Sequence, residues 1–246
     1  MSERYWQRPV PLAAALLAAA GAAAVTGCSS SGAGAASSGA SATSSAGMAA
    51  ANLPASFTAA QLRDALLTKV NGERPAGPAE SGSYGLLPDV QTSKQSMHGV
   101  SVDPAKCAEA TVTGFNSAAF SDAPASVVTF RVGQDGVSEV IVAASQATAT
   151  EALAAKLPVG CAHYHATVDG KTFAYAVKEI PVAGIAEQAR ALNVKAAGYA
   201  DVDVWSVVFR GGGYVGAVTI VGPDSSEQGA RVLAKDAYTR AAAQLH

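Results

Sequence analysis

The residue of this chain best suited to chemistry is Cys28, which stands directly after Val25, Thr26 and Gly27. A short basic segment, an apolar run and then small residues that lead into a cysteine are typical of a bacterial lipoprotein signal. We therefore expect cleavage before Cys28 and a diacylglyceryl group on its sulfur. The mature protein would be lipid-anchored to the cell membrane, on its extracytoplasmic face.

A permanent membrane-spanning helix is the competing interpretation of the N-terminal run. From Val10 to Val25 the chain contains only alanine, leucine, proline, glycine and valine, and Arg4 and Arg8 precede this run. A spanning helix needs about 20 apolar residues, and this run is shorter, rich in weakly hydrophobic alanine, and has no charge at its far end. These features favour a cleaved signal in residues 1–27.

Two further cysteines, Cys107 and Cys161, remain once Cys28 is assigned to lipid. An even pair in an oxidising compartment predicts a disulfide bond. Closing a loop of this length would stabilise the fold by about 4 kcal/mol in the chain-entropy model. A reactive free thiol is the alternative.

Cys161, His163 and His165 alternate along the chain, so a strand would place all three side chains on one face. Three such ligands with one open position would describe a catalytic zinc site. The predicted disulfide already uses Cys161, however, and no fourth ligand has a recognisable spacing. Asp201 and Asp203 could hold a cation, but a solvated strand edge is the simpler interpretation. We expect neither a metal nor another cofactor.

The motifs of common hydrolases are absent from the sequence. No G-x-S-x-G, S-x-x-K or H-E-x-x-H pattern occurs, and the sequence does not position His98 against any serine. The run 211–213 is all glycine, but it lacks the Lys-Ser/Thr of a phosphate loop and lies between two predicted strands, which indicates a turn. We expect no catalysis.

Aromatic side chains supply the candidate binding surface. Trp205 lies in one predicted hairpin, and Tyr164 and Tyr175 lie in another, next to His163. If the helices leave part of the sheet face open, these residues would line an apolar groove, as ligand pockets commonly require. A packed core is the alternative interpretation.

The charge of the chain excludes some partners. Loss of residues 1–27 removes Arg4, Arg8 and Glu3, which leaves 15 Lys and Arg against 18 Asp and Glu, a formal charge of −3. A slightly acidic chain with scattered charges has no electrostatic footprint for nucleic acid and no polybasic patch for anionic lipid. The expected contact with the membrane is therefore the lipid on Cys28.

Composition divides the chain into three parts. Residues 1–27 are the predicted signal, residues 28–52 the lipidated cysteine with a Ser/Gly/Ala-rich flexible tether, and residues 53–246 a single extracytoplasmic domain. The tether cannot bury enough apolar surface to order itself. Its mean reach is roughly 25–30 Å, enough to hold a domain away from the lipid surface.

Turn and capping signals predict the elements of that domain. Thr58 and Gln61 have capping-box spacing, and the helix that they open should end at Asn71-Gly72. Asp103-Pro104 should open a second helix, which carries Cys107. Two more helices should begin near 148 and near 224–227, and residues 72–100 read as irregular. Three hairpins are expected, at 126–132 with 137–143, 161–168 with 171–178, and 202–210 with 214–221.

Hairpins interleaved with helices predict the α+β class. We expect an antiparallel sheet built from hairpins and packed with three to four helices, mainly on one face.

The layout also resembles a known family. A lipoprotein signal, a tether, an early Leu-Leu helix, the segment Asp-Pro-Ala-Lys-Cys-Ala at 103–108, a hairpin and a later cysteine occur in that order. This order resembles the actinobacterial and mycobacterial secreted lipoproteins of the DUF5642 type over roughly residues 53–245. It is more distantly similar to the extracellular sensor domains of PknH-type kinases, which have two disulfides where this domain has cysteines for one. The resemblance implies an α+β domain with a cleft, a binding role and no known catalysis.

Three hypotheses of function follow. The first is an envelope lipoprotein whose domain binds a lipid or protein ligand, which requires a concave groove beside the sheet. The second is a lipid or glycolipid carrier, which requires a deep and dry internal cavity. The third is an envelope hydrolase, which requires a Ser or His constellation in a cleft.

Overall fold

The computed structural model describes residues 57–110, 115, 117–197 and 202–245. The predicted signal, Cys28, the tether and Asp201 lie outside the described residues. The described chain forms one nine-stranded sheet in the order β1-β3-β4-β9-β8-β7-β6-β5-β2, and every neighbouring pair is antiparallel. The strands are β1 (Glu80–Ser83), β2 (Val100–Asp103), β3 (Pro124–Val132), β4 (Asp135–Ala143), β5 (His163–Val168), β6 (Lys171–Ile180), β7 (Gln188–Ala197), β8 (Val202–Gly211) and β9 (Tyr214–Gly222).

Five α-helices and two 3₁₀ turns accompany the sheet in the described residues. They are α1 (Ala59–Ala65), η2 (Tyr84–Leu86), α2 (Pro88–Met97), η3 (Ala105–Glu109), α3 (Ala118–Ser121), α4 (Gln146–Ala154) and α5 (Glu227–Gln244). Together with the antiparallel sheet they confirm the α+β class predicted from the sequence.

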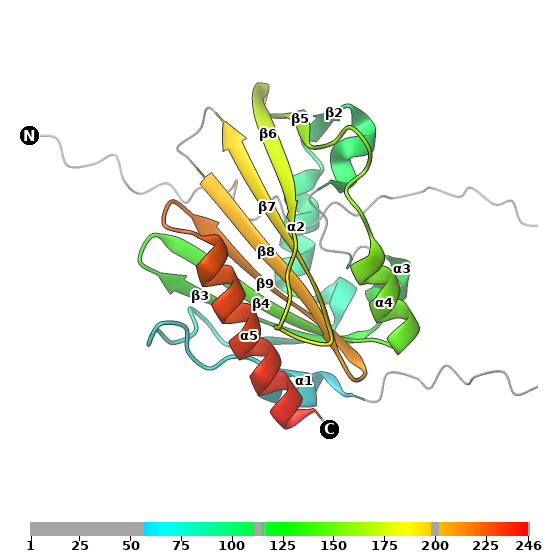
Figure 1. The fold of residues 1–246 in the computed structure, drawn as a ribbon, viewed down its shortest axis with the longest axis vertical. Coiled ribbons are helices and arrows are strands. Elements are labelled where there is room, and N and C mark those ends of the chain that lie inside the picture. Colours follow the sequence, from blue (N-terminus) through cyan, green and yellow to red (C-terminus); the bar gives the residue numbers. More distant parts are fainter. Residues whose placement is uncertain (1–56, 111–114, 116, 198–201, 246) are drawn as a thin grey trace, which may run out of the picture.

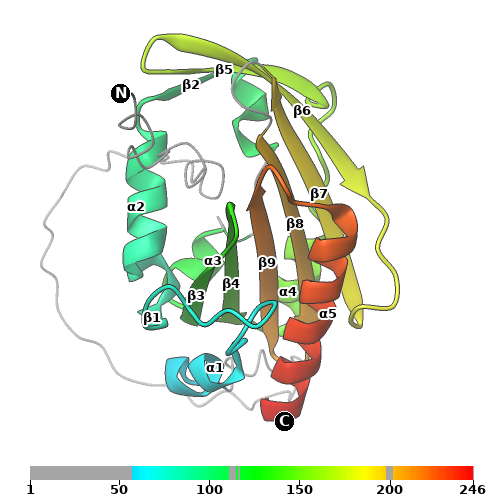
Figure 2. The same ribbon diagram turned by 90° about the vertical axis from the view of Figure 1, so that its left-hand side faces the viewer.

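Helices cover both faces of the sheet, not mainly one as expected. On one face, α1 and α5 pack over a cluster that includes Ile141, Phe209 and Val218. On the opposite face, α2, α3 and α4 cover a second cluster around Phe120 and Val142. Figure 1 shows α5 lying across the strands, and Figure 2 shows α5 and α2 on opposite sides of the sheet. The central strands carry apolar side chains on both faces of the sheet, so each face needs a cover of helices.

All three predicted hairpins form, with ends shifted by a few residues. Asp169 and Gly170 both have positive φ, 49° and 74°, as the favoured two-residue hairpin turn requires. The capping box of α1 is also present, because the Thr58 side chain accepts the N–H of Gln61 and the Gln61 side chain accepts the N–H of Thr58.

The predicted first helix is shorter than expected. α1 ends at Ala65, and Asn71-Gly72 does not stop a helix but turns a tight bridge in which Val70 and Glu73 exchange backbone hydrogen bonds of 3.0 and 2.9 Å. Asn71 and Gly72 have φ of 49° and 87°, the values that such a turn needs.

The segment 72–100 is not irregular, since it contains β1, η2 and α2. Cys107 lies on the 3₁₀ turn η3, not on an α-helix, and β7 was not predicted at all. Among the described residues, no helix combines the length and the apolar character needed to cross a bilayer.

Candidate functional site

Tyr164 and Tyr175 lie together in the core. They are cross-strand partners on β5 and β6, their rings stack with centroids 5.1 Å apart, and each is 5% exposed. Both belong to a buried cluster with Phe173, Val194 and the two cysteines. The pair therefore packs the sheet face that the helices α2, α3 and α4 share, and it does not line an open surface.

Trp205 lies on the other face of the sheet. It is partly buried against the cluster beneath α1 and α5, and its register partner on β9 is Ile220, a member of that cluster. His163 also falls on this face, because it neighbours Tyr164 along β5, but it is exposed. The four residues therefore do not line one groove, and that part of the sequence interpretation is wrong.

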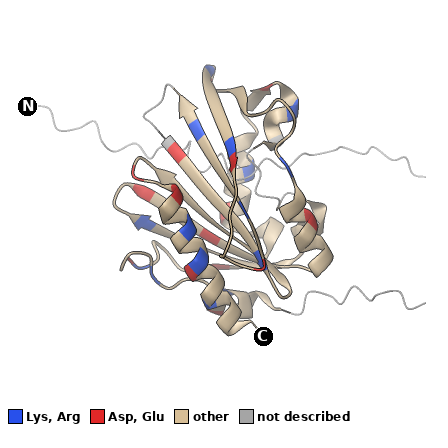
Figure 3. Ribbon diagram, viewed as in Figure 1, with Lys and Arg blue, Asp and Glu red and all other residues tan. Residues whose placement is uncertain are grey.

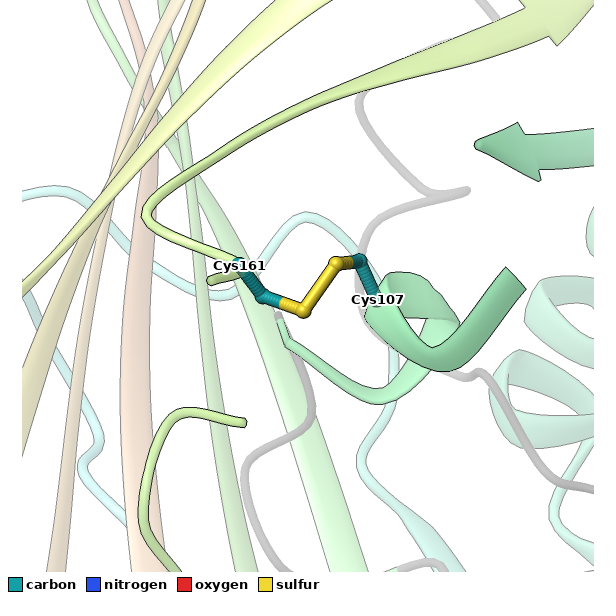
Figure 4. The surroundings of a disulfide bond; sticks show 2 residues. All are labelled: Cys107 and Cys161. Atoms are coloured by element: carbon teal, nitrogen blue, oxygen red, sulfur yellow. A yellow bond between two sulfur atoms is a disulfide. The ribbon is translucent and has the colours of Figure 1, made fainter. Parts of the chain in front are cut away.

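The cysteines predicted to pair are joined in the structure. Cys107 on η3 and Cys161, two residues before β5, have Cα atoms 5.3 Å apart and form a disulfide (Figure 4). Both are fully buried among the residues around Tyr164. The bond ties η3 to the outer part of the sheet and removes Cys161 from any metal site.

The described residues that were weighed for metal binding do not come together as a metal site. Within the described ranges, no group of three or more His, Cys, Asp or Glu side chains could hold a metal ion. His165 is exposed, and Asp203 forms an ion pair of 3.1 Å with Lys195 and accepts a hydrogen bond from Asn193.

A cavity of about 270 Å³ lies between the first turns of α5, the ends of β3 and β4, and the turn at Val70-Asn71. Its floor is apolar and comes from segments far apart in the sequence. The floor residues are Val70, Val132, Val137, Ile220 and Leu233, and Val232 also lines the cavity. Val232 is 47% exposed, so this side chain lies at the mouth.

The rim of the cavity is acidic. Asp135 opens β4 and is 8% exposed, and its Oδ1 accepts the backbone N–H of Asp224 at 3.1 Å. Burial raises the pKa of Asp135, and the nearby charge of Asp224 raises it further, against the opposing effect of that hydrogen bond. Figure 3 shows acidic positions on β4 and on the loop before α5 close to the first turn of α5.

A glycine makes the approach of Asp135 feasible. Gly222 ends β9 with φ of 155°, and a Cβ at this position would overlap the Asp135 carboxylate. This site was not predicted from the sequence, although the pattern does indicate the turn before β4 and a helix start near Asp224. Nothing in the sequence pattern shows that these two segments meet.

Comparisons with known proteins support the fold. No protein-family model and no curated protein match the sequence. The structure is similar to the extracellular domain of PknH from Mycobacterium tuberculosis, with a TM-score of 0.53 and 14% identity over 77% of this chain and 98% of that chain. The Rv0999 ortholog from Mycobacterium smegmatis, an uncharacterized protein, gives a TM-score of 0.35 and 17% identity over 58% of this chain and 76% of that chain. At 14% identity the first match shows a shared fold, as the predicted resemblance to PknH-type domains implied.

Proposed function

We propose that this chain is a lipid-anchored lipoprotein of the cell envelope whose α+β domain binds a ligand or partner, as a sensor domain does. The observation that carries the proposal is the fold, which the chain shares with an extracellular domain over nearly the whole of that domain. The site of action would be the outer side of the plasma membrane, with the domain held on its tether.

The disulfide supports an extracytoplasmic location independently of the fold. Cys107 and Cys161 are fully buried and bonded, and bonds of this kind persist in oxidising compartments and are rare in the cytosol. A bacterial protein that depends on such a bond is expected to fold after export.

The anchor is tested by replacing Cys28 with alanine in the full chain, with Ser29→Ala as the matched control. After expression in an actinobacterial host and partition between detergent and water, wild type and Ser29→Ala should enter the detergent phase. The intact mass of the wild-type chain should show a diacylglyceryl group on Cys28, since two acyl chains supply the membrane affinity, and Cys28→Ala should lack this mass. A wild-type chain that begins at Cys28 and carries no acyl mass would exclude the lipid anchor.

The binding role is supported by the cavity beside α5, which joins an apolar floor to the carboxylates of Asp135 and Asp224, as small-molecule sites join apolar surface to a few polar groups. Native mass spectrometry of the protein released from its own host membrane tests this role. A non-covalent adduct that disappears on denaturation is expected. A spectrum that contains the acylated chain alone would contradict ligand binding, whereas the anchoring experiment is independent of this result.

The two alternatives have no comparable support. A carrier needs a deep, enclosed volume for acyl chains, whereas the cavity beside α5 is small, about 270 Å³, with the exposed Val232 at its mouth. A hydrolase needs a nucleophile held against a base, and His98, the histidine considered for this role, is exposed at the end of α2 and makes no side-chain hydrogen bond among the described residues.

A further inference from the structure

The cavity beside α5 carries two carboxylates and no cation. Asp135 and Asp224 line it, and none of the residues that line it is a lysine or an arginine. The nearest arginine on the same helix, Arg231, is already engaged, because it pairs with Glu227 at 2.8 Å and donates to the backbone oxygen of Pro181. Among the described residues that line the cavity, the two carboxylates therefore have no cationic partner.

Each of the two carboxylates has at least one oxygen that can accept a further hydrogen bond. Asp135 uses Oδ1 to accept the N–H of Asp224, and among the described residues its Oδ2 has no hydrogen-bond partner. The side chain of Asp224 likewise makes no hydrogen bond there, and Asp135 is 8% exposed. Asp224 is exposed, and two carboxylates held this close together favour the approach of a cation or of a hydrogen-bond donor.

The N-terminus of α5 does not reverse this preference. A helix N-terminus acts as roughly +0.5 of a charge, which cannot offset two full negative charges. The cap residue Ser226 also satisfies one of its free N–H groups, since its hydroxyl accepts from Gly229 at 3.1 Å. The cavity should therefore repel anions and attract cations.

An organic cation fits better than a metal ion. Ca²⁺ prefers six to eight oxygen ligands, and Mg²⁺ demands an octahedral shell. Two carboxylates above a floor of valine, isoleucine and leucine do not provide such a shell. An ammonium group, by contrast, donates three hydrogen bonds and leaves its alkyl chain free to lie on the apolar floor.

We infer that this cavity binds a primary ammonium group carried on a short aliphatic body. The ammonium lies between Asp135 and Asp224, and the aliphatic part packs on Val137 and Ile220. A volume of about 270 Å³ has room for several carbon atoms in addition to the nitrogen. This inference rests on the proposed binding function and names the chemistry of the ligand.

Butylammonium is the probe, and methyl NMR of the full chain in a non-ionic detergent is the measurement. The methyl signals of Val70, Val137 and Val232 should shift in a saturable manner. Val159, which is 90% exposed and does not line the cavity, should not shift. Neutral 1-butanol should bind at least about tenfold more weakly, because it lacks the charge-assisted hydrogen bonds, and butanoate should not bind.

Asp135→Asn tests the contribution of the negative charge, because asparagine has nearly the same shape as aspartate but no charge. An asparagine retains an oxygen that can accept the N–H of Asp224, so the fold should persist while butylammonium affinity falls at least about tenfold. Asp169→Asn is the matched control, because Asp169 lies in the exposed β5–β6 turn and tolerates asparagine at its positive φ. This control variant should bind as wild type does.

A second pair of variants avoids any change to the buried carboxylate. Val232→Lys places an ammonium at the mouth of the cavity, where it should compete with butylammonium and abolish the saturable shifts. Val232→Thr keeps the shape of valine and should retain binding. Both substitutions fall on an exposed helical position, which limits their effect on folding.

Equal binding of butanoate or butanol, unchanged affinity in Asp135→Asn, or shifts that also reach Val159 would each overturn the inference. Such a result would leave the proposed function intact if native mass spectrometry still detected an adduct. The absence of any adduct together with a failed titration would count against both.

Discussion

Oε2 of Glu139 accepts the backbone N–H of Leu67 at 2.7 Å, and this bond joins the middle of the sheet to the residues that follow α1. Glu139 lies on β4 and is fully buried. Among the described residues its second oxygen, Oε1, has no hydrogen-bond partner. Arg240 of α5 adds to the same junction by donating to the carbonyl oxygens of Leu66 and Asp64. The C-terminal end of α1 is thus held by the buried carboxyl group of Glu139 and by the guanidinium group of Arg240 on α5.

Glu139 should make stability fall as the pH rises. Burial raises the pKa of Glu139 to about 8, although the N–H of Leu67 and the charge of Arg240 lower it. An unfolded chain releases this proton near its ordinary pKa of 4.5. Between pH 4.5 and 8 the folded state therefore holds more protons, and the free energy of unfolding falls by up to about 1.4 kcal/mol per pH unit before it levels off.

Glu139→Gln isolates this effect. Urea unfolding of wild type and variant from pH 5 to 8 should give a difference in free energy that moves steadily in favour of the variant. Other groups with raised pKa values, such as Glu80 and Asp135, titrate alike in both proteins and cancel. A difference that does not depend on pH would show that Glu139 is already ionised in the folded state.

Arg240→Met should loosen α1 more than the rest of the domain. The variant keeps the aliphatic stem but leaves two carbonyl oxygens without their donor and removes the cation near Glu139, at a cost of about 1–3 kcal/mol. Hydrogen exchange should speed up most at the amides of Leu62 and Leu67.

Arg63→Met is the matched control for Arg240→Met. The Arg63 side chain is 51% exposed and its contact with Asp64 is a surface pair of 3.5 Å, so its loss should change stability by less than about 1 kcal/mol. Equal exchange profiles for the two variants would argue against a specific role for Arg240.

The sequence predicted the hairpins well because their signals are local. Asp169-Gly170 at a two-residue turn, with alternating strands on both sides, specifies β5 and β6 without reference to the rest of the chain. By contrast β7 carries Arg190 and Lys195 among alanines, which is a weak strand pattern. Its position between β6 and β8 supplies the pairing that makes it a strand.

The candidate site could not be predicted from the sequence because it depends on contacts between distant segments. Asp135 and the N–H of Asp224 are 89 residues apart in sequence and meet only because β4 and β9 are neighbours in the sheet. Glu139 did leave a signal, since alternation along β4 places it on the same face as Val137 and Ile141. A charged residue at a predicted core position indicates a buried partner, but it does not identify Leu67.

Replacing both Cys107 and Cys161 by alanine should lower the free energy of unfolding by about 4 kcal/mol, because the bond closes a loop with a sequence separation of 54. The urea midpoint of the double variant tests this value. Reductant should move the wild-type midpoint towards that of the variant and leave the variant unchanged. A reductant-insensitive wild type would mean that packing alone stabilises this part of the sheet.

Gly216→Ala should disrupt the packing beneath α5. A Cβ at Gly216 on β9 would overlap the ring of Phe209 on β8, and this ring is fully buried and packs edge-on against Tyr238. Because the ring is enclosed by the core and would have to shift, a destabilisation of about 1–3 kcal/mol is expected in thermal or urea unfolding. Gly212→Ala is the control, since a Cβ at that turn position meets no atom within 4 Å, and its effect should stay within about 0.5 kcal/mol. If both variants were equally stable, Phe209 could relax away from the strand, and the close contact of ring and backbone would not be a requirement of the fold.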